Sequence, residues 1–598
     1  MRIESFQYSA FASRFPSSIR ACTSACIIWC LIVCTSVVSA QTTTRTPRLG
    51  PKVVQGQHGI VVCETPVAAE IGGEILAKGG TAVDAAIATA IALQVTWPEA
   101  GNIGGGGFMM VAPPHDDVVC VEYRERAPLS TNKNSFVEWT DMHHPRVAGV
   151  PGTLRGLELA HQKYGKLSWS ELVTPSVKIA REGFEVNEYL AASMNGVLRQ
   201  KSLQNDPIFE EFRRVYCHPE GRPWQKGDRL VQPDLASTLQ IIADDGADSF
   251  YEGHIAKQLV DEMSRNGGLI TLEDLKSYTA TVRPAIVGEV KGYAVYGAPL
   301  PSSGGITILN QLRLLEQLPL TRPESTAWSV ENVHLLTEAM RRTFRDRAAY
   351  LGDTDFIEKP AHLLGPDHAA RLASSVNLTK ATSSASIANG IKLADDHESM
   401  QTTHFSVIDK DGMAVSNTYT LEASYGCRIV VKGAGFLLNN EMGDFNFKPG
   451  ITNTKGRIGT EPNQIAPGKR MLSSQSPTIV KKDGKVCLVI GSPGGRTIIN
   501  TVSEILVQKL FFDRSLAEAI DAPRFHHQWF PDVITFEDDE DGLFESMDAQ
   551  LQRMGHETSH PANRQQGAAH GIEIDPKTGV VTGVSDARLG GGAYAVSP

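Results

Sequence analysis

The sequence has no excess of basic residues, few cysteines and no low-complexity tract. Its 57 Lys and Arg residues are outnumbered by 67 Asp and Glu residues, which gives a formal net charge of -10. Nucleic-acid binding requires a basic face that neutralises phosphates, so this charge balance argues against a nucleic-acid partner. The chain has 598 residues, of which 41% are hydrophobic, and is long enough to bury a large core.

The nine cysteines form no recognisable framework. Four of them lie in an apolar segment near the start of the chain: Cys22, Cys26, Cys30 and Cys34. The other five are odd in number and widely spaced: Cys63, Cys120, Cys217, Cys427 and Cys487. This spacing indicates neither a disulfide framework nor a zinc site, and we expect most of these thiols to be buried as small apolar side chains.

The first 40 residues differ from the rest of the sequence. Arginines precede an apolar run over residues 21–38, and the run ends in the small-residue sequence VSA at 38–40. This pattern predicts a signal peptide over 1–40, cleaved before Gln41. The alternative is an uncleaved anchor, because the run is barely long enough to span a bilayer. We therefore expect an exported protein, periplasmic or extracellular, and membrane-anchored under the alternative.

The remainder of the chain mixes helix and strand patterns. Residues 65–95 predict two Ala-rich helices that meet near Gly80, and Thr81 is a suitable N-cap for the second. The apolar run at 118–123 predicts a buried strand, and the D-K-D-G sequence at 409–412 predicts a hairpin turn between two strands. Helices and strands alternate irregularly, so we expect a layered α/β or α+β protein with one continuous core.

Two short motifs suggest chemistry. HETSH at 556–560 matches the zinc pattern H-E-x-x-H, which requires a helix, but Gly555 and Pro561 indicate a helix end turning into a strand. GSPGG at 491–495 follows an apolar strand and precedes a helical pattern. It lacks the Lys-Ser/Thr of a phosphate-binding P-loop, but its backbone N–H groups suit an oxyanion hole, with a plain tight turn as the alternative.

Two adjacent threonines, Thr402 and Thr403, stand where a loose polar segment meets a strand pattern. A β-branched residue suits a strand start, which is the simplest explanation. An N-terminal threonine, however, would carry its own base in the α-amine and could act as a nucleophile. This requires a cut before the threonine, and the small, polar segment 377–401 predicts a flexible connector that would allow the new ends to separate.

Several long motifs in order resemble the γ-glutamyltransferases, a family of N-terminal-nucleophile hydrolases. The resemblance runs from about residue 52 to residue 588 and is carried by these stretches: GNIGGGGF at 101–108, YRERAP at 123–128, GVPGTLRG at 149–156, LPSSGG at 300–305, FRDRAAYLGD at 344–353, TTHFSVIDKDGMAVSNTYT at 402–420, NNEMGDF at 439–445, RMLSSQSP at 470–477 and VIGSPGG at 489–495. It implies an αββα sandwich in which one core is shared by two autoproteolytic subunits. The large subunit would comprise residues 41–401 and the small subunit residues 402–598, associated as a heterodimer.

The resemblance also implies the roles of individual residues. Cleavage would lie between Gln401 and Thr402, with Thr402 as the nucleophile and Thr420 positioning it. The other implied site residues are Arg124, Ser473 and Ser474 for the substrate α-carboxylate, Glu441 and Asp444 for its α-ammonium, and Gly494 and Gly495 for the oxyanion hole. Without the resemblance, a structural Arg124–Glu125 ion pair and solvated acids would be the simpler interpretation.

The implied activity is γ-glutamyl transfer or hydrolysis of glutathione and related donors, with water, an amino acid or a dipeptide as acceptor and without a metal or cofactor. Two positions depart from the family pattern. Glu422 stands where Asn is usual, which adds a carboxylate to the predicted ammonium site and raises one pKa there. Lys455 stands where many members have Tyr, in the segment 449–470 that resembles a lid. Glu422 supports an alternative, an acylase of another side-chain amide, and the second alternative is an inactive γ-glutamyl-binding relative.

Overall fold

The computed structural model describes residues 50–388, 390–391, 393–394, 402–450, 452–455, 457–539 and 541–597. The predicted signal peptide and Gln41 therefore lie outside the described residues. The chain divides into two compact units, residues 1–47 and 48–598, and the fold below is that of the second unit. Among the described residues, no helix combines the length and apolar character needed to cross a membrane.

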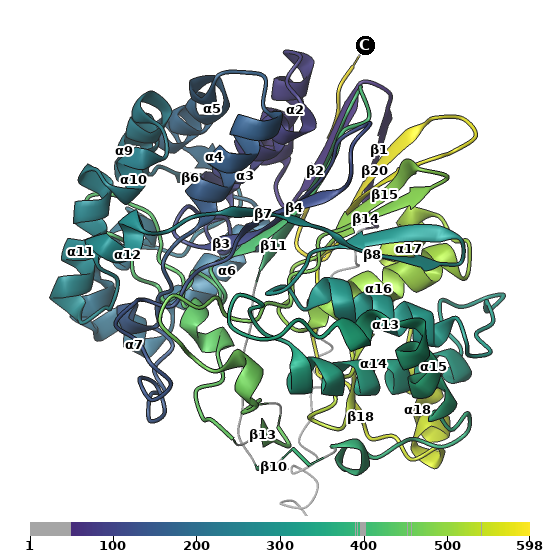
Figure 1. The fold of residues 1–598 in the computed structure, drawn as a ribbon. Helices are drawn as coiled ribbons and strands as arrows, with labels where there is room; N and C mark the ends of the chain where they lie inside the picture. Colours follow the sequence, from purple (N-terminus) through teal and green to yellow (C-terminus); the bar gives the residue numbers. More distant parts are fainter. Residues whose placement is uncertain are drawn as a thin grey trace, which may run out of the picture. The chain divides into compact units, whose positions relative to one another are not determined.

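Two seven-stranded antiparallel sheets form the centre of this unit (Figure 1). The first sheet has the order β21 (Gly592–Ala595), β2 (Gly59–Cys63), β11 (Thr403–Asp409), β12 (Ala414–Thr420), β3 (Gly106–Ala112), β4 (Val119–Tyr123) and β7 (Thr281–Pro284). The second has the order β1 (Lys52–Gly56), β20 (Val581–Ser585), β19 (His570–Ile574), β15 (Lys485–Gly491), β14 (Thr478–Lys482), β9 (Tyr293–Gly297) and β8 (Ile286–Val290).

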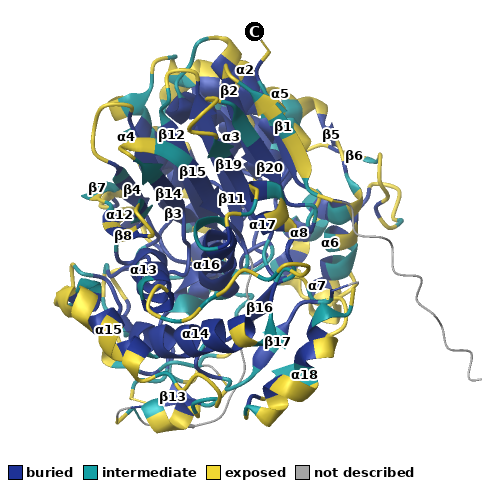
Figure 2. Cartoon of the chain, turned by 90° about the vertical axis from the view of Figure 1, so that its right-hand side faces the viewer, coloured by how far each residue is buried: buried dark blue, intermediate teal, exposed yellow. Residues whose placement is uncertain are grey.

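Helices cover the outer face of each sheet, and the central strands β2, β11, β12 and β3 of the first sheet are wholly buried, whereas the edge strand β1 is largely exposed (Figure 2). The first sheet is covered by α2 (Pro66–Ala77), α3 (Ala82–Thr96) and α4 (Thr153–Tyr164), with α5 (Trp169–Glu182) and α9 (Pro233–Asp245) packed outside them. The second sheet is covered by α13 (Gly304–Leu315), α16 (Thr497–Leu510) and α17 (Leu516–Asp521), with α14 (Val330–Tyr350), α15 (Pro366–Ser374) and α18 (Leu543–Arg553) beyond.

The remaining elements are short helices and strands around these layers. They are α6 (Glu188–Leu198), α7 (Lys201–Asn205), α8 (Glu210–Tyr216), α10 (Asp248–Tyr251), α11 (His254–Asn266), α12 (Leu272–Lys276), β5 (Phe184–Glu185), β6 (Arg229–Leu230), β10 (Leu393–Ala394), β13 (Thr452–Asn453), β16 (Phe525–His526), β17 (Ile534–Phe536) and β18 (Thr558–Ser559). Three apolar clusters occupy the interfaces: helices on the first sheet, helices on the second sheet, and sheet on sheet. The arrangement is the predicted αββα sandwich.

The alternation of side chains along β11 explains the layering. Phe405 and Val407 pack under the helices of the first sheet, whereas Ile408 packs between the two sheets. Successive strand residues point to opposite faces, so this pattern fixes the register of the hairpin. The D-K-D-G turn joins β11 to β12 as predicted, and Asp409 accepts hydrogen bonds from the backbone N–H groups of Asp411 and Met413, both at 3.0 Å.

The two Ala-rich helices also agree with the prediction. The side chain of Thr81 accepts from the backbone of Asp84, and the Asp84 carboxylate accepts from the backbone of Thr81, which forms a capping box at the start of α3. Gly79 adopts a φ of +84°, which ends α2 with a left-handed turn. All of α3 is buried, because it lies between the first sheet and the outer helices.

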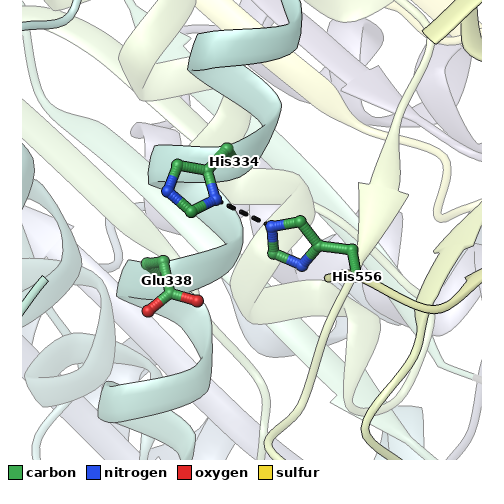
Figure 3. A group of neighbouring side chains, drawn as sticks. All are labelled: His334, Glu338 and His556. Atoms are coloured by element: carbon green, nitrogen blue, oxygen red, sulfur yellow. Dashed lines mark hydrogen bonds between the residues drawn. The ribbon is translucent and has the colours of Figure 1, made fainter. Parts of the chain in front are cut away.

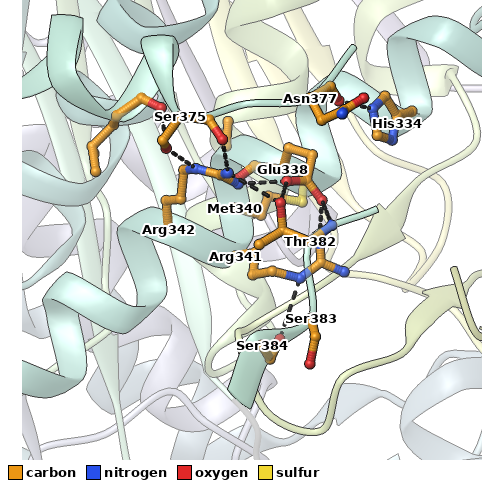
Figure 4. Close-up of polar contacts among 12 residues, drawn as sticks. His334, Glu338, Met340, Arg341, Arg342, Ser375, Asn377, Thr382, Ser383 and Ser384 are labelled. Carbon is orange, nitrogen blue, oxygen red and sulfur yellow. Dashed lines mark hydrogen bonds and ion pairs between the residues drawn. The ribbon is translucent and has the colours of Figure 1, made fainter. Parts of the chain in front are cut away.

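The segment before the predicted cleavage point is described continuously as far as residue 388, and it lies mostly at the surface, with Ser384 and Ala388 buried. Figure 4 shows residues 375–384 lying along α14, where Thr382 donates from its backbone N–H to Glu338 Oε1 at 3.0 Å and from its hydroxyl to Glu338 Oε2 at 2.5 Å. Ser384 is fully buried. Thr382 thus satisfies a buried charge and attaches this loop to α14. Residues 389, 392 and 395–401, including Gln401, lie outside the described residues.

Candidate active site

Nine of the ten residues that the sequence predicts for the site line one pocket with about 280 Å³ of space. They are Thr402, Thr420, Gly495, Arg124, Glu422, Glu441, Asp444, Ser473 and Ser474. Gly494 precedes Gly495 in the same turn. Sequence reasoning missed two lining residues, Gln475 and Ile498. Gln475 stands within the RMLSSQSP motif, so its neighbours were a usable signal.

The hairpin β11–β12 places Thr402 and Thr420, the two threonines that the sequence predicts to be catalytic, side by side. Thr403 pairs with Tyr419, so the next position along the ladder sets Thr402 beside Thr420. Thr402 and Thr420 are both buried and both line the pocket, whereas Thr403 is buried outside it. The opposite facing of adjacent strand residues therefore favours Thr402 over Thr403 as the nucleophile.

Glycines allow the backbone to approach this hairpin closely. A Cβ atom on Gly105 would lie 2.0 Å from the carbonyl oxygen of Thr420, so the position requires glycine. Asn102 Nδ2 donates to the same carbonyl at 2.9 Å. The GNIGGGGF motif thus holds the end of β12 in place, which agrees with the expected close backbone approach.

The GSPGG turn connects β15 to α16 as predicted. Gly494 has a φ of +128° and Gly495 a φ of +55°, both in the region that favours glycine. Gly495 lines the pocket together with Thr402 and with Ile498 in the first turn of α16. A glycine turn at a helix start, next to the proposed nucleophile, is suited to stabilising a negative oxygen.

One guanidinium in the pocket contacts three carboxylates. Arg124 Nη1 lies 2.7 Å from Glu441 Oε2 and 3.2 Å from Glu125 Oε2, and Arg124 Nη2 forms a short contact with Asp444. Arg124, Glu125 and Glu441 are completely buried. The structural Arg124–Glu125 pair exists, and it coexists with contacts to both acids that the resemblance assigns to the ammonium. We call Arg124, Glu125, Glu422, Glu441 and Asp444 the pocket cluster.

The surplus of carboxylates raises pKa values in the pocket cluster. Burial raises the pKa of Glu125 to about 7, against the opposing charge of Arg124. Burial also raises the pKa of Glu441 well above its ordinary value, and the neighbouring charges of Glu125, Asp444 and Glu422 act in the same direction. The predicted raised pKa thus falls on Glu441 and Glu125. Crowded like charges have this effect in many functional sites.

Glu422 adopts a strained backbone. Its φ is +78°, a left-handed conformation that residues with a Cβ rarely occupy. Its backbone N–H donates to the hydroxyl of Thr420 at 2.8 Å. The strain keeps the Glu422 side chain in the lining of the pocket, beside Glu441. Strain of this kind concentrates at functional sites.

A second group of side chains offers metal-ligand atoms (Figure 3). His334, Glu338 and His556 bring such atoms within 4.8 Å of one another, and His334 Nδ1 lies 2.7 Å from His556 Nε2. Glu338 is already held by the guanidinium groups of Arg341 and Arg342, whose charges oppose a cation. We therefore read the group as a hydrogen-bonded contact between α14 and the chain after α18.

The HETSH motif contributes only one histidine to this group. His556 follows the end of α18, and His560 lies after β18, where its Nε2 is 3.0 Å from Asp548 Oδ1. The prediction that the motif is a helix end turning into a strand is confirmed. No local pattern indicated that His556 would meet His334, because the two residues are 222 positions apart.

Comparison with known proteins agrees with this geometry. A family model described as gamma-glutamyltranspeptidase matches residues 68–596. The chain belongs to this family. It is 43% identical over 494 residues to the glutathione hydrolase proenzyme of Escherichia coli, covering 81% of this chain and 83% of that one. It is 41% identical over 551 residues to the proenzyme of Pseudomonas aeruginosa, covering 90% and 95% of the two chains.

Solved structures support the fold. Cephalosporin acylase from Bacillus halodurans superimposes with a TM-score of 0.81 over 93% of this chain and 99% of its own, at 24% identity, so the likeness is one of fold alone. The γ-glutamyltranspeptidase of Helicobacter pylori gives a TM-score of 0.51 over 55% of this chain and 93% of its own, at 34% identity. Both comparisons are consistent with a layered N-terminal-nucleophile hydrolase.

Proposed function

We propose that the protein is a γ-glutamyltransferase or glutathione hydrolase that matures by cutting itself between Gln401 and Thr402. The observation that carries the proposal is the pocket itself. It brings the Thr402 hydroxyl together with one guanidinium, two serine hydroxyls and three carboxylates that can hold an amino acid head group. The curated relatives named glutathione hydrolase proenzyme support both the donor and the processing.

Maturation begins with the hydroxyl of Thr402. The oxygen attacks the carbonyl carbon of Gln401, the peptide nitrogen leaves, and the acyl group moves from nitrogen to oxygen. Water then hydrolyses the resulting ester, which leaves a carboxylate on Gln401 and a new α-amine on Thr402. An α-amine has an ordinary pKa near 8 and can act as the base that a threonine hydroxyl otherwise lacks.

In each turnover the hydroxyl oxygen of Thr402 acts first as the nucleophile and then as the leaving group. The α-amine of Thr402 takes the hydroxyl proton while the oxygen attacks the γ-carbonyl of the donor. Backbone N–H groups of Gly494 and Gly495 stabilise the oxyanion, the proton passes to the leaving amine, and a γ-glutamyl ester remains on Thr402. Water, an amino acid or a dipeptide then attacks this ester and regenerates the hydroxyl. Thr420, beside Thr402, holds the nucleophile in place.

The head group of the donor is recognised by opposite charges. Arg124, Ser473 and Ser474 bind the α-carboxylate, since a guanidinium and two hydroxyls supply directed donors. Glu422, Glu441 and Asp444 bind the α-ammonium. A bound zwitterion replaces the internal contacts of Arg124 with Glu441 and Asp444, so each buried charge keeps an opposite partner.

The acylase alternative is less well supported by this pocket. A glutaryl donor has no α-ammonium, so binding it would leave Glu422, Glu441 and Asp444 without a cation. The acylase neighbour resembles this chain in fold only. The inactive-relative alternative requires that Thr402 serve no purpose, although it stands buried in the pocket beside Thr420.

Processing would yield a large subunit of residues 41–401 and a small subunit of residues 402–598 that stay associated. The two sheets favour association, because each contains strands from both sides of the cleavage point. For localisation we propose export to the periplasm or the cell exterior, on the basis of the apolar run at 21–38 and the small-residue sequence after it.

The first experiment tests both cleavage and chemistry. Protein purified without added protease is examined by mass spectrometry and N-terminal sequencing, next to Thr402→Ala. The proposal requires two fragments in the wild type, the smaller beginning Thr402-Thr403-His404, and one intact chain in the variant. It also requires that the wild type release the aniline from a γ-glutamyl anilide. An intact wild-type chain after long incubation would favour the inactive-relative alternative.

A further inference from the structure

Arg347 on α14 contacts the loop that carries Ser473 and Ser474 without itself lining the pocket. The residue is largely buried, and its Nη2 lies 2.9 Å from the hydroxyl oxygen of Ser474. Its Nε lies 2.8 Å from the hydroxyl oxygen of Ser303. Ser474 lines the pocket and Arg347 does not. Arg347 can therefore act on the substrate through the residues that it contacts, of which Ser474 lines the pocket.

The direction of these hydrogen bonds follows from the chemistry of the groups. A guanidinium only donates, so the oxygen of Ser474 accepts from Arg347. The hydroxyl hydrogen of Ser474 then remains to be donated elsewhere, and the pocket beside Arg124 is the space that the residue lines. Arg347 thus prepares Ser474 as a donor toward an anion, instead of leaving it to act as an acceptor.

The hydroxyl of Ser473 is also oriented as a hydrogen-bond donor, but a different group orients it. Its hydroxyl oxygen accepts from the backbone N–H of Gln475 at 3.1 Å, which leaves its hydrogen available as well. Two neighbouring hydroxyls that both present hydrogens match the two oxygens of a carboxylate. The two serines differ in what fixes them: Ser473 depends on its own loop, whereas Ser474 depends on the distant helix α14.

Ser303 links Arg347 to the backbone of the same loop. Arg347 donates to the Ser303 oxygen, and the Ser303 hydroxyl donates in turn to the carbonyl of Ser473 at 2.6 Å. The backbone N–H of Ser303 reaches the same carbonyl at 2.8 Å. Arg347 therefore fixes both the hydroxyl of Ser474 and, through Ser303, the position of the loop that carries it.

We propose that Arg347 is a positioning residue that holds the Ser474 hydroxyl as a hydrogen-bond donor to the α-carboxylate of the γ-glutamyl donor. The inference deepens the proposed function and rests on it. The side chain acts from α14, in the large subunit, on a loop of the small subunit, so it also makes donor recognition depend on the correct seating of that helix.

The test compares two donors that differ only in the group concerned. A γ-glutamyl anilide carries the α-carboxylate, whereas a 4-aminobutanoyl anilide has the same amine and amide without it. In processed Arg347→Met protein we expect KM for the γ-glutamyl anilide to rise about tenfold or more, since a hydrogen bond from a charged donor is lost. We expect kcat to change little, and kcat/KM for the 4-aminobutanoyl anilide to stay as in the wild type.

Three further variants make the result specific. Ser474→Ala should reproduce the selective loss, and the double variant should be no worse than Ser474→Ala alone, because both changes remove one interaction. Arg347→Lys, which retains a charged donor, should restore part of the KM. Arg345→Met is the matched control: Arg345 lies on the same helix, pairs with Asp346 3.0 Å away and does not line the pocket, so donor selectivity should not change.

Several outcomes would overturn the inference. Equal losses on both donors in Arg347→Met would show a general structural role, and additive effects in the double variant would show that Arg347 does not act through Ser474. If Arg347→Met remains unprocessed, Arg347→Lys and Ser474→Ala decide the matter, because a selective KM effect in neither would contradict the proposal. A wild-type protein that is processed but inactive on the γ-glutamyl anilide would refute the proposed function itself.

Discussion

Two buried groups of charged residues in this protein are built in opposite ways. The pocket cluster has one guanidinium, Arg124, among four carboxylates. The second group, which we call the α14 cluster, balances two guanidiniums against two carboxylates, with Glu338 between the guanidiniums, and comprises Glu338, Arg341, Arg342, Thr382 and Asp532. Both are largely shielded from water, so the difference lies in how completely their charges are satisfied.

In the α14 cluster, both oxygens of Glu338 are satisfied by Thr382 and by the flanking arginines. Burial opposes ionisation of Glu338, but the charges of Arg341 and Arg342 and the hydrogen bonds from Thr382 hold its pKa below the ordinary value. In the pocket cluster, Glu441 Oε1 accepts no hydrogen bond from the described residues, and the pKa of Glu441 is raised. We infer that the α14 cluster, whose charges are satisfied, has a structural role, and that the pocket cluster, whose carboxylates are not all satisfied, can bind a ligand cation.

The largest effect should follow from removing the single cation of the pocket cluster. Arg124→Met leaves the carboxylates of this cluster without a partner and removes the main group for the α-carboxylate. Loss of one partner of a buried charge pair costs about 2–5 kcal/mol, so we expect kcat/KM for a γ-glutamyl anilide to fall about 10³-fold. Steady-state kinetics of processed protein measure this, with a thermal melt to establish folding.

Arg126→Met is the control for this change. Arg126 lies in the same YRERAP motif but donates to Thr279 and does not line the pocket. Its variant should keep wild-type KM. If both arginine variants lost activity equally, the pocket cluster would be a structural group like the α14 cluster, and the contrast between the two would disappear.

Glu338→Gln should lower the stability of the fold and leave substrate binding unchanged, the opposite of what we expect for Arg124→Met. The neutral side chain leaves Arg341 and Arg342 without their shared carboxylate, and breaking a buried pair from one side costs about 3 kcal/mol of unfolding free energy. We expect a lower denaturation midpoint, with KM close to that of the wild type in whatever protein remains folded. Glu331→Gln, at an exposed site in the first turn of the same helix, should leave the midpoint unchanged. A KM rise without loss of stability would contradict the assignment.

The two clusters also differ in how far the sequence reveals them. Thr402, Arg124, Glu441 and Gly494 lie in long motifs that resemble the γ-glutamyltransferases, and this resemblance implied both the αββα fold and the residues of the pocket. In the α14 cluster, only the pairing of Glu338 with Arg341 and Arg342 is local, at i, i+3 and i, i+4 on one helix. Thr382 lies 44 positions from Glu338, and Asp532 lies 194 positions from it. Such pairing depends on packing between distant segments, which periodicity and composition do not encode.

Segment 377–401 shows the same limit. Its small polar residues predicted a surface loop or a disordered connector, but not the contacts that it makes. In the structure, Ser384 donates from its backbone N–H to Asp532 at 2.7 Å and accepts at its carbonyl from Trp529 Nε1 at 2.9 Å. These partners lie about 150 residues from Ser384 in the sequence and attach the loop to the rest of the fold at this residue.

Glu422 gives a smaller and more selective prediction. Glu422→Asn removes one of three carboxylates around the α-ammonium but retains a polar side chain. We expect the preference for a γ-glutamyl over a glutaryl anilide to fall about fivefold, which corresponds to an interaction of about 1 kcal/mol at a partly exposed site. The ratio of kcat/KM values for the two anilides measures it. An unchanged ratio would mean that Glu422 does not face the ammonium.

The pH dependence of ligand binding should show the smallest effect and the clearest sign. Burial raises the pKa of the Glu125 carboxyl to about 7, so this carboxyl binds a proton increasingly as pH falls below neutrality. A bound ammonium in the pocket favours the ionised form, so binding releases this proton and affinity rises as pH increases from 6 to 8.

Calorimetric titration of processed protein with L-glutamate, in buffers of different ionisation enthalpy, should detect proton release at pH 6.5. Glu125→Gln should abolish that release, whereas Glu331→Gln should preserve it. Proton release unchanged in Glu125→Gln would assign the titration to another group and remove Glu125 from the ligand-sensitive part of the pocket cluster.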